Sequence, residues 1–80
     1  MYALPEHPGV ELSRLLAKNG WNIAQFSKMI GVSTSRVSEI ISGKRRVSID
    51  SAFRLADAFD MTPEYWLRKQ NEYDISIRNS

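Results

Sequence analysis

The stretch that decides the fold is residues 22–43, which read NIAQFSKMIGVSTSRVSEIISG. Apolar residues recur at helical spacing in residues 23–30 and again in residues 37–41, and the tripeptide Gly-Val-Ser at 31–33 separates the two series. Helices this short must bury one face against the rest of the chain to be stable. The pattern therefore predicts two short helices joined by a tight turn.

Polar residues at the ends of these two apolar series predict the same helix boundaries. Asn22 and Ser33 are favourable N-cap residues, and Gln25 stands three residues after Asn22, the spacing of a capping box. Gly31 permits the turn between the helices, and Gly43 is expected to end the second one. Together, the signals predict a helix-turn-helix over about residues 22–43.

Three more helical blocks flank this unit. One is expected over residues 8–18, another begins at Ser48, and a third begins at Thr62-Pro63-Glu64, an N-terminal signal for a helix. The helical signal fades after Tyr73, so residues 75–80 are expected to be frayed. The chain is thus predicted to be a single all-α domain of five helices spanning residues 1–80. The expected apolar faces of the second and fourth helices are Ile23, Phe26, Met29 and Ile30, and Ile49, Ala52, Phe53, Leu55, Ala56 and Phe59.

Composition narrows the classes of function. The chain has 80 residues, no cysteine and one histidine, His7, which is interpreted as a cap or turn residue. The sequence has no pair of metal ligands, no phosphate-cradling glycine loop and no nucleophile with a partner histidine. We therefore expect no enzyme activity, no metal site and no cofactor. Trp66 is interpreted as core. Without a long apolar run or a signal-peptide pattern, the chain is expected to be soluble, cytoplasmic and not bound to a membrane.

Charge is unevenly distributed along the chain. The net charge is only +2, but residues 22–46 carry five lysines and arginines against one acid. Residues 47–67 carry one arginine, Arg54, against four acids, two of them within helical reach of it. For Arg54 we favour a weak surface pair over a role in orienting a charged face. A basic segment in the helix-turn-helix region favours a polyanionic partner, although basic runs are also common in solvated loops.

The second helix of the unit has the composition of a helix that reads DNA. Val37, Ile40 and Ile41 form a narrow apolar stripe, and the remaining residues are polar. A helix inserted in the major groove presents its first turn deepest, so Arg36 can donate two hydrogen bonds to guanine and Glu39 can accept one from cytosine N4. The alternative for Arg36 is a solvated helix cation. The alternatives for Glu39 are an intrahelical partner and a negative charge that excludes wrong DNA sites. The predicted base-contacting residues are Thr34, Ser35, Arg36 and Glu39.

Phosphate contacts are expected at the ends of the same unit. Hydroxyl, amide and free backbone N–H groups at helix ends can bind phosphate oxygens, although capping alone is the simpler role. The cations that follow the second helix would lie along the sugar-phosphate backbone and add affinity without sequence information. The predicted phosphate-contacting residues are Asn22, Ser33, Ser42, Lys44, Arg45 and Arg46.

With these residues identified, the chain resembles the phage repressor and Cro class of helix-turn-helix proteins. More narrowly, it resembles the HigA/VapI-type antitoxins of bacterial toxin-antitoxin operons. The resemblance rests on His7-Pro8-Gly9, Gly31-Val32-Ser33, the run RVSEIISGKRRVS at 36–48, AFRLA at 52–56, Phe59, TPEYWL at 62–67, Gln70 and Tyr73-Asp74. Two features depart from the family pattern: Asp60 stands where a glycine-like turn residue is favoured, and the chain ends soon after the fifth helix.

The resemblance implies a lambda-repressor-like fold and a homodimer that binds double-stranded operator DNA and represses its own operon. It also implies a RelE/HigB-like toxin partner. Thr34, Ser35 and Glu39 match base-contact positions of the class, and Asn22, Ser33, Ser42 and Lys44 match its phosphate-contact positions. Apart from the resemblance, an exposed aromatic patch of Met61, Tyr65 and Tyr73 is a candidate dimer interface. A solitary phage-like repressor and a helical protein-interaction module remain alternatives.

Overall fold

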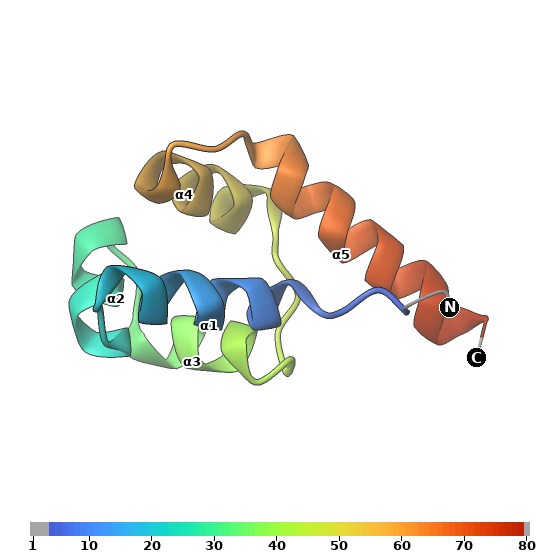
Figure 1. Cartoon of the computed structure of the whole chain (residues 1–80), viewed down its shortest axis with the longest axis horizontal. Helices are drawn as coiled ribbons and strands as arrows, with labels where there is room; N and C mark the ends of the chain where they lie inside the picture. The colour runs from blue at the N-terminus through green and yellow to red at the C-terminus, as the bar shows by residue number, and fades with distance from the viewer. Residues whose placement is uncertain (1–3, 80) are drawn as a thin grey trace.

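The computed structural model describes residues 4–79, which form five helices and no strand. The predicted all-α architecture is therefore confirmed. In Figure 1, α2 and α3 lie at one end of the molecule beside α1, and α5 extends to the opposite end, where the N-terminal segment also lies. The helices are α1 (Pro8–Asn19), α2 (Ile23–Ile30), α3 (Thr34–Ile41), α4 (Ile49–Phe59) and α5 (Pro63–Arg78).

Most helix starts follow from local sequence. The side chains of His7, Asn22, Ser33 and Ser48 each accept a hydrogen bond from a backbone N–H of the first turn that follows, and Asn22 and Gln25 complete the predicted capping box. Thr62 makes no side-chain cap, so α5 begins instead with Pro63 at its first position. The Ser33 cap fixes the end of the connection between α2 and α3, at the start of α3.

The turns that follow α2 and α4 are among those with a left-handed backbone. Gly31 has φ 74° and ends α2, which confirms its predicted role in the turn. Asp60 adopts the same conformation, with φ 55°, at the end of α4. A residue with a Cβ is strained there, although aspartate tolerates the conformation better than most. Glycine would adopt this conformation without that strain.

The fifth helix is longer than the sequence predicts. It runs to Arg78, so the expected fraying from residue 75 is not seen within the described residues, and Ser80 lies outside them. The Nε2 atom of Gln70 donates to Asp74 across one turn, and the Ser76 hydroxyl donates to the Tyr73 carbonyl. These contacts stabilise the last turns of α5. Those turns contain few apolar residues, so their sequence lacks the apolar spacing that predicts a helix.

Some of the residues expected on the apolar faces of α2 and α4 are buried in the core, and others are not. Met29, Ile49 and Phe53 were expected to be buried, but they are 52%, 67% and 54% exposed. The prediction was wrong for these three because neighbouring helices cover only one narrow side of α2 and α4. The buried core consists of Leu12, Leu16, Phe26, Val37, Ile40, Val47, Ala52, Leu55, Ala56 and Trp66.

Replacement of Gly9 by alanine is expected to destabilise the fold by about 1–3 kcal/mol, although alanine is the better helix former. A Cβ at this position would overlap the carbonyl oxygen of Ile40 and lie 2.9 Å from the Cα of Ile41, so α1 would have to move away from α3. Urea unfolding measures the effect. Gly20→Ala is a contrasting control with open space around its Cβ but a φ of 71°. A Gly9→Ala variant as stable as the unchanged chain would contradict the close approach.

The stability of the fold is expected to fall as the pH drops below about 6.5. The Nδ1 atom of buried His7 accepts a hydrogen bond from the Gly9 amide at 2.9 Å, which the protonated atom cannot do. Burial lowers the pKa of His7, against the opposing attraction of Asp74. The unfolded chain therefore binds the proton more readily than the fold. Urea midpoints measured across this pH range test the prediction, and His7→Asn, which keeps a capping oxygen without titrating, should flatten the profile.

Candidate nucleic-acid interface

The outer face of α3 is open to solvent. Val37 and Ile40 are 1% and 3% exposed and anchor the inner face of the helix, which packs against α1 and α2. Thr34, Ser35 and Ser38 are exposed on the other side, as the sequence predicts. Short side chains on a firmly seated helix allow its backbone to approach a groove closely. A shallow hollow between α2 and α3 is lined by Ile23, Ala24, Thr34, Ser35, Ser38 and Glu39.

The two predicted caps beside this face retain hydrogen-bonding capacity. Asn22 is exposed and uses its Oδ1 atom to accept from the Gln25 amide at 2.7 Å, which leaves its amide nitrogen for another acceptor. Ser33 is also exposed, and its Oγ accepts from the Arg36 amide at 3.1 Å while its hydroxyl proton can still be donated. Capping and phosphate binding are therefore compatible at both residues.

The loop after α3 folds back over the C-terminal end of that helix. The amides of Lys44 and Arg45 both donate to the Glu39 carbonyl oxygen, at 2.9 and 3.1 Å, and the Ser42 hydroxyl donates to the same atom at 3.2 Å. Gly43 has φ 80°, which allows this reversal. The loop cations are thereby held next to the last turn of α3.

The three loop cations differ in their partners. Arg45 pairs with the Glu39 carboxylate at 2.7 Å, and Arg46 pairs with Asp74 at 2.8 Å. Lys44 is exposed and forms no ion pair within residues 4–79. The partner of Glu39 is therefore a loop arginine and not the intrahelical residue that the sequence left open. Lys44 is the cation most available to a phosphate.

The loop is also tied to α5 by a buried residue that sequence reasoning did not single out for a role. Gln70 is 2% exposed, its Oε1 accepts from the Val47 amide at 2.7 Å, and its Nε2 donates to Asp74. The available signal was its position one turn after Trp66, on the same face of α5. Gln70 thus fixes the chain immediately after the cations.

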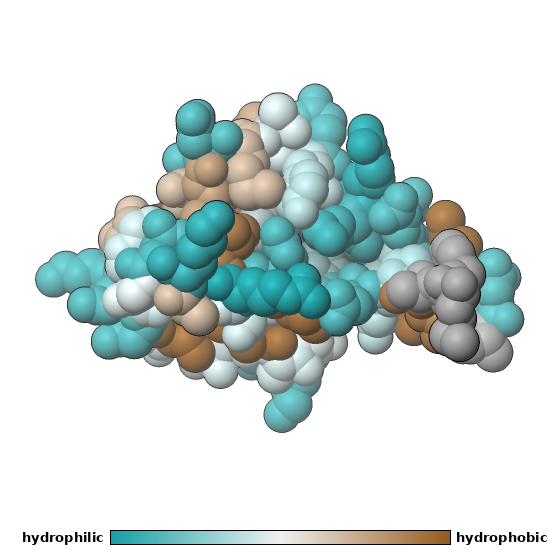
Figure 2. Space-filling model, in the orientation of Figure 1, coloured by the Kyte–Doolittle hydropathy of each residue, from teal (hydrophilic) through white to brown (hydrophobic). Residues whose placement is uncertain are grey.

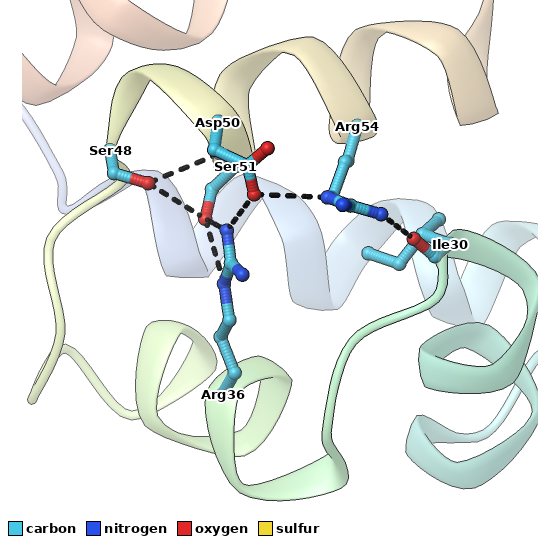
Figure 3. A network of polar contacts seen from close by, with 6 residues as sticks. All are labelled: Ile30, Arg36, Ser48, Asp50, Ser51 and Arg54. Carbon is cyan, nitrogen blue, oxygen red and sulfur yellow. Dashed lines mark hydrogen bonds and ion pairs between the residues drawn. The ribbon is translucent and has the colours of Figure 1, made fainter.

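Arg36 does not lie where the sequence predicted. Its Nη2 atom is 2.6 Å from Asp50 Oδ2 and 2.7 Å from Ser51 Oγ, and its side chain is only 26% exposed (Figure 3). The guanidinium of Arg36, which was expected to face a base, reaches α4 instead, where it donates to an acid and a hydroxyl. A base contact by Arg36 would require these bonds to break.

Arg54 belongs to the same group of contacts. It donates through Nε to Asp50 at 2.9 Å and through Nη1 to the carbonyl of Ile30 at 2.6 Å (Figure 3). The favoured interpretation of Arg54 as no more than a weak surface pair was incomplete, since it also binds the last residue of α2. Hydrogen bonds from Arg36 and Arg54 lower the pKa of Asp50, which keeps the carboxylate charged.

The residues predicted as a dimer patch have partners within the chain. Met61 packs against the core, and the Tyr65 hydroxyl donates to Glu11 at 3.2 Å. The Tyr73 ring meets His7 edge-on, with ring centroids 5.0 Å apart. All three residues are half-buried. They form intramolecular contacts and are only partly available to a second molecule.

The remaining surface is mixed. Figure 2 shows a largely hydrophilic face, with hydrophobic surface below α1 and at the end of α5. Leu4, Ile75 and Ile77 are among the exposed apolar residues. No helix within residues 4–79 is long and apolar enough to cross a membrane. Within the same residues, no three metal-binding side chains gather.

Comparisons with known proteins agree with this arrangement. The helix-turn-helix family model matches residues 12–66. Virulence-associated protein A′ of Dichelobacter nodosus is 41% identical over 73 residues, which are 90% of this chain and 64% of that protein. A HigA-family addiction module antidote protein from Coxiella burnetii is 38% identical, with a TM-score of 0.86 over 94% of this chain and 83% of that one. Pseudomonas aeruginosa antitoxin HigA, solved with the higBA promoter, is 31% identical, with a TM-score of 0.89 over 92% and 82%.

Proposed function

Because the chain belongs to the helix-turn-helix family and is a DNA-binding protein of the HigA/VapI antitoxin type, we propose that it represses its own operon and neutralises a toxin. The observation that carries the DNA-binding part is the outer face of α3. Thr34, Ser35 and Ser38 are exposed there, and potential phosphate donors lie at both ends of the face. An antitoxin of the same fold, solved with the higBA promoter, supports DNA binding by this chain.

The roles of individual residues follow from their positions. Thr34 and Ser35, in the first turn of α3, contact base edges, and Glu39 accepts from a cytosine one turn later. When Arg45 binds a phosphate, its ion pair with the Glu39 carboxylate breaks and frees Glu39 for the base. The proposed phosphate contacts are Asn22, Ser33, Ser42, Lys44, Arg45 and Arg46, whose side chains or amides lie at the ends of α2 and α3.

The proposed DNA-bound form is a homodimer on an inverted repeat. One α3 reads only a few base pairs, and two-fold pairing doubles the readout over two half-sites about 10 base pairs apart or a multiple of that spacing. Selection of duplexes from a random pool, followed by footprinting and measurement of stoichiometry, tests this. A single asymmetric half-site bound by one chain would contradict the dimer, and selection without enrichment would contradict specific DNA binding.

The toxin part of the proposal is tested separately. The partner is a short, basic RelE/HigB-like protein that cleaves mRNA, encoded next to this chain. Co-expression of the two should restore growth and allow the toxin to copurify. A neighbouring product that is not toxic, or whose toxicity this chain leaves unchanged, would reject the antitoxin function. The chain would then be a solitary repressor.

A further inference from the structure

We infer that Arg36 acts as a positioning residue for DNA reading, because it holds the first turn of α3 against α4 through Asp50 and Ser51 and does not itself contact a base. The inference rests on the proposed function, in which α3 reads the operator. Asp50 and Ser51 lie outside the helix-turn-helix, yet through Arg36 they influence sequence discrimination. This role also differs from the direct base contact that the sequence suggested for Arg36.

The contact between Arg36 and α4 has several bonds and a fixed receiving site. Two guanidinium nitrogens of Arg36 donate to Ser51 Oγ, at 3.1 and 2.7 Å, and Nη2 also donates to Asp50. Ser51 is 3% exposed, and its Oγ also lies 3.2 Å from the Ser48 hydroxyl, within hydrogen-bond distance. Figure 3 shows the Arg36 side chain rising from α3 to meet these residues at the start of α4. A planar guanidinium held by several acceptors has little freedom to turn.

A second arginine extends the contact to α2. Arg54 donates to the same Asp50 oxygen as Arg36, and its Nη1 donates to the Ile30 carbonyl at 2.6 Å. Ile30 is the last residue of α2 and directly precedes the turn. Asp50 therefore joins two cations that separately hold the end of α2 and the start of α3. The relative orientation of the two helices of the unit depends on this carboxylate.

Release of Arg36 to a base would be unfavourable. Its bond to Asp50 joins two charged groups, a stronger class of hydrogen bond than a neutral one. Without Arg36, Asp50 would keep only Arg54 as a cationic partner and would present more negative charge to the DNA. The base-reading side chains Thr34 and Ser35 are short, so their reach depends on the placement of the helix itself. Such sites require support to within about half an ångström.

The test compares discrimination between two duplexes: one selected from a random pool by the unchanged protein, and a scrambled version of it. Arg36→Ala and Asp50→Asn should each lower the ratio of the two affinities by about tenfold. The double variant should lose little more than either single variant, because both changes break the same contact. Asp57→Asn is the matched control, since it removes one acid from α4 without touching Arg36. It should leave the ratio unchanged.

One combination of results would reject the inference. If Asp50→Asn keeps full discrimination while Arg36→Ala relaxes it at one base pair per half-site, Arg36 is a base reader and the inference is wrong. Thermal melting checks that each variant is folded at the assay temperature. If Arg36→Ala is unfolded, Arg36→Lys, which keeps the charge but not the fork of donors, replaces it and should show a smaller loss. A selection that enriches no sequence for the unchanged protein would reject the proposed function instead.

Discussion

Replacement of Trp66 by alanine is expected to remove about 3–5 kcal/mol from the free energy of unfolding. Trp66 is fully buried, and its ring lies against those of Phe59 and Tyr65, with centroids 6.2 and 5.6 Å away. A domain of this size is stable by only about 4–12 kcal/mol, so this loss would remove a large share of the stability of the fold. Urea unfolding followed by circular dichroism measures the loss.

Trp66→Phe is the matched control for this substitution. The indole Nε1 is buried and has no hydrogen-bond partner among the described residues. Phenylalanine removes this unsatisfied donor, a gain that offsets part of the lost volume. The loss should therefore be clearly smaller than for alanine. A Trp66→Ala variant that loses under about 1 kcal/mol would show that α5 contributes little to the core.

The parts of the fold that the sequence predicted are those decided locally. The caps at Asn22 and Ser33 and the turn at Gly31 depend on residues within one helical turn of each other. The sequence carries these signals directly, because capping needs only a short polar side chain beside free amides. The helix-turn-helix and its exposed face were therefore predictable.

The features that the sequence missed depend on which helices meet. Arg36 has acceptors 14 and 15 residues away, and the bond between Gln70 and Val47 joins residues 23 apart. Helical periodicity placed Arg36 beside the outer face of α3, but the position of α4 decided where the side chain went. The exposure of Phe53 has the same origin, because periodicity cannot show how wide a face the neighbouring helices cover.

Removal of the three loop cations together should produce the largest effect on DNA binding. Each phosphate contact contributes about 0.9 to the slope of log affinity against log salt, so Lys44→Ala/Arg45→Ala/Arg46→Ala should lower that slope by up to about three times this amount. Near 0.1 M salt, this corresponds to a loss of affinity on the order of a hundredfold or more. Arg68→Ala, an exposed cation on α5, is the single-charge control for each position.

The single variants should separate the three cations according to their partners. Lys44→Ala should show the full change in slope and no change in discrimination, because Lys44 has no ion pair to replace among residues 4–79. Arg45→Ala should also alter discrimination, because it leaves the Glu39 carboxylate unpaired on the face of α3. Arg46→Ala should cost less than Lys44→Ala, since Arg46 must leave Asp74 to reach a phosphate. Equal effects at all three positions would mean that DNA does not compete with these ion pairs, and an unchanged slope in the triple variant would place the phosphate contacts elsewhere.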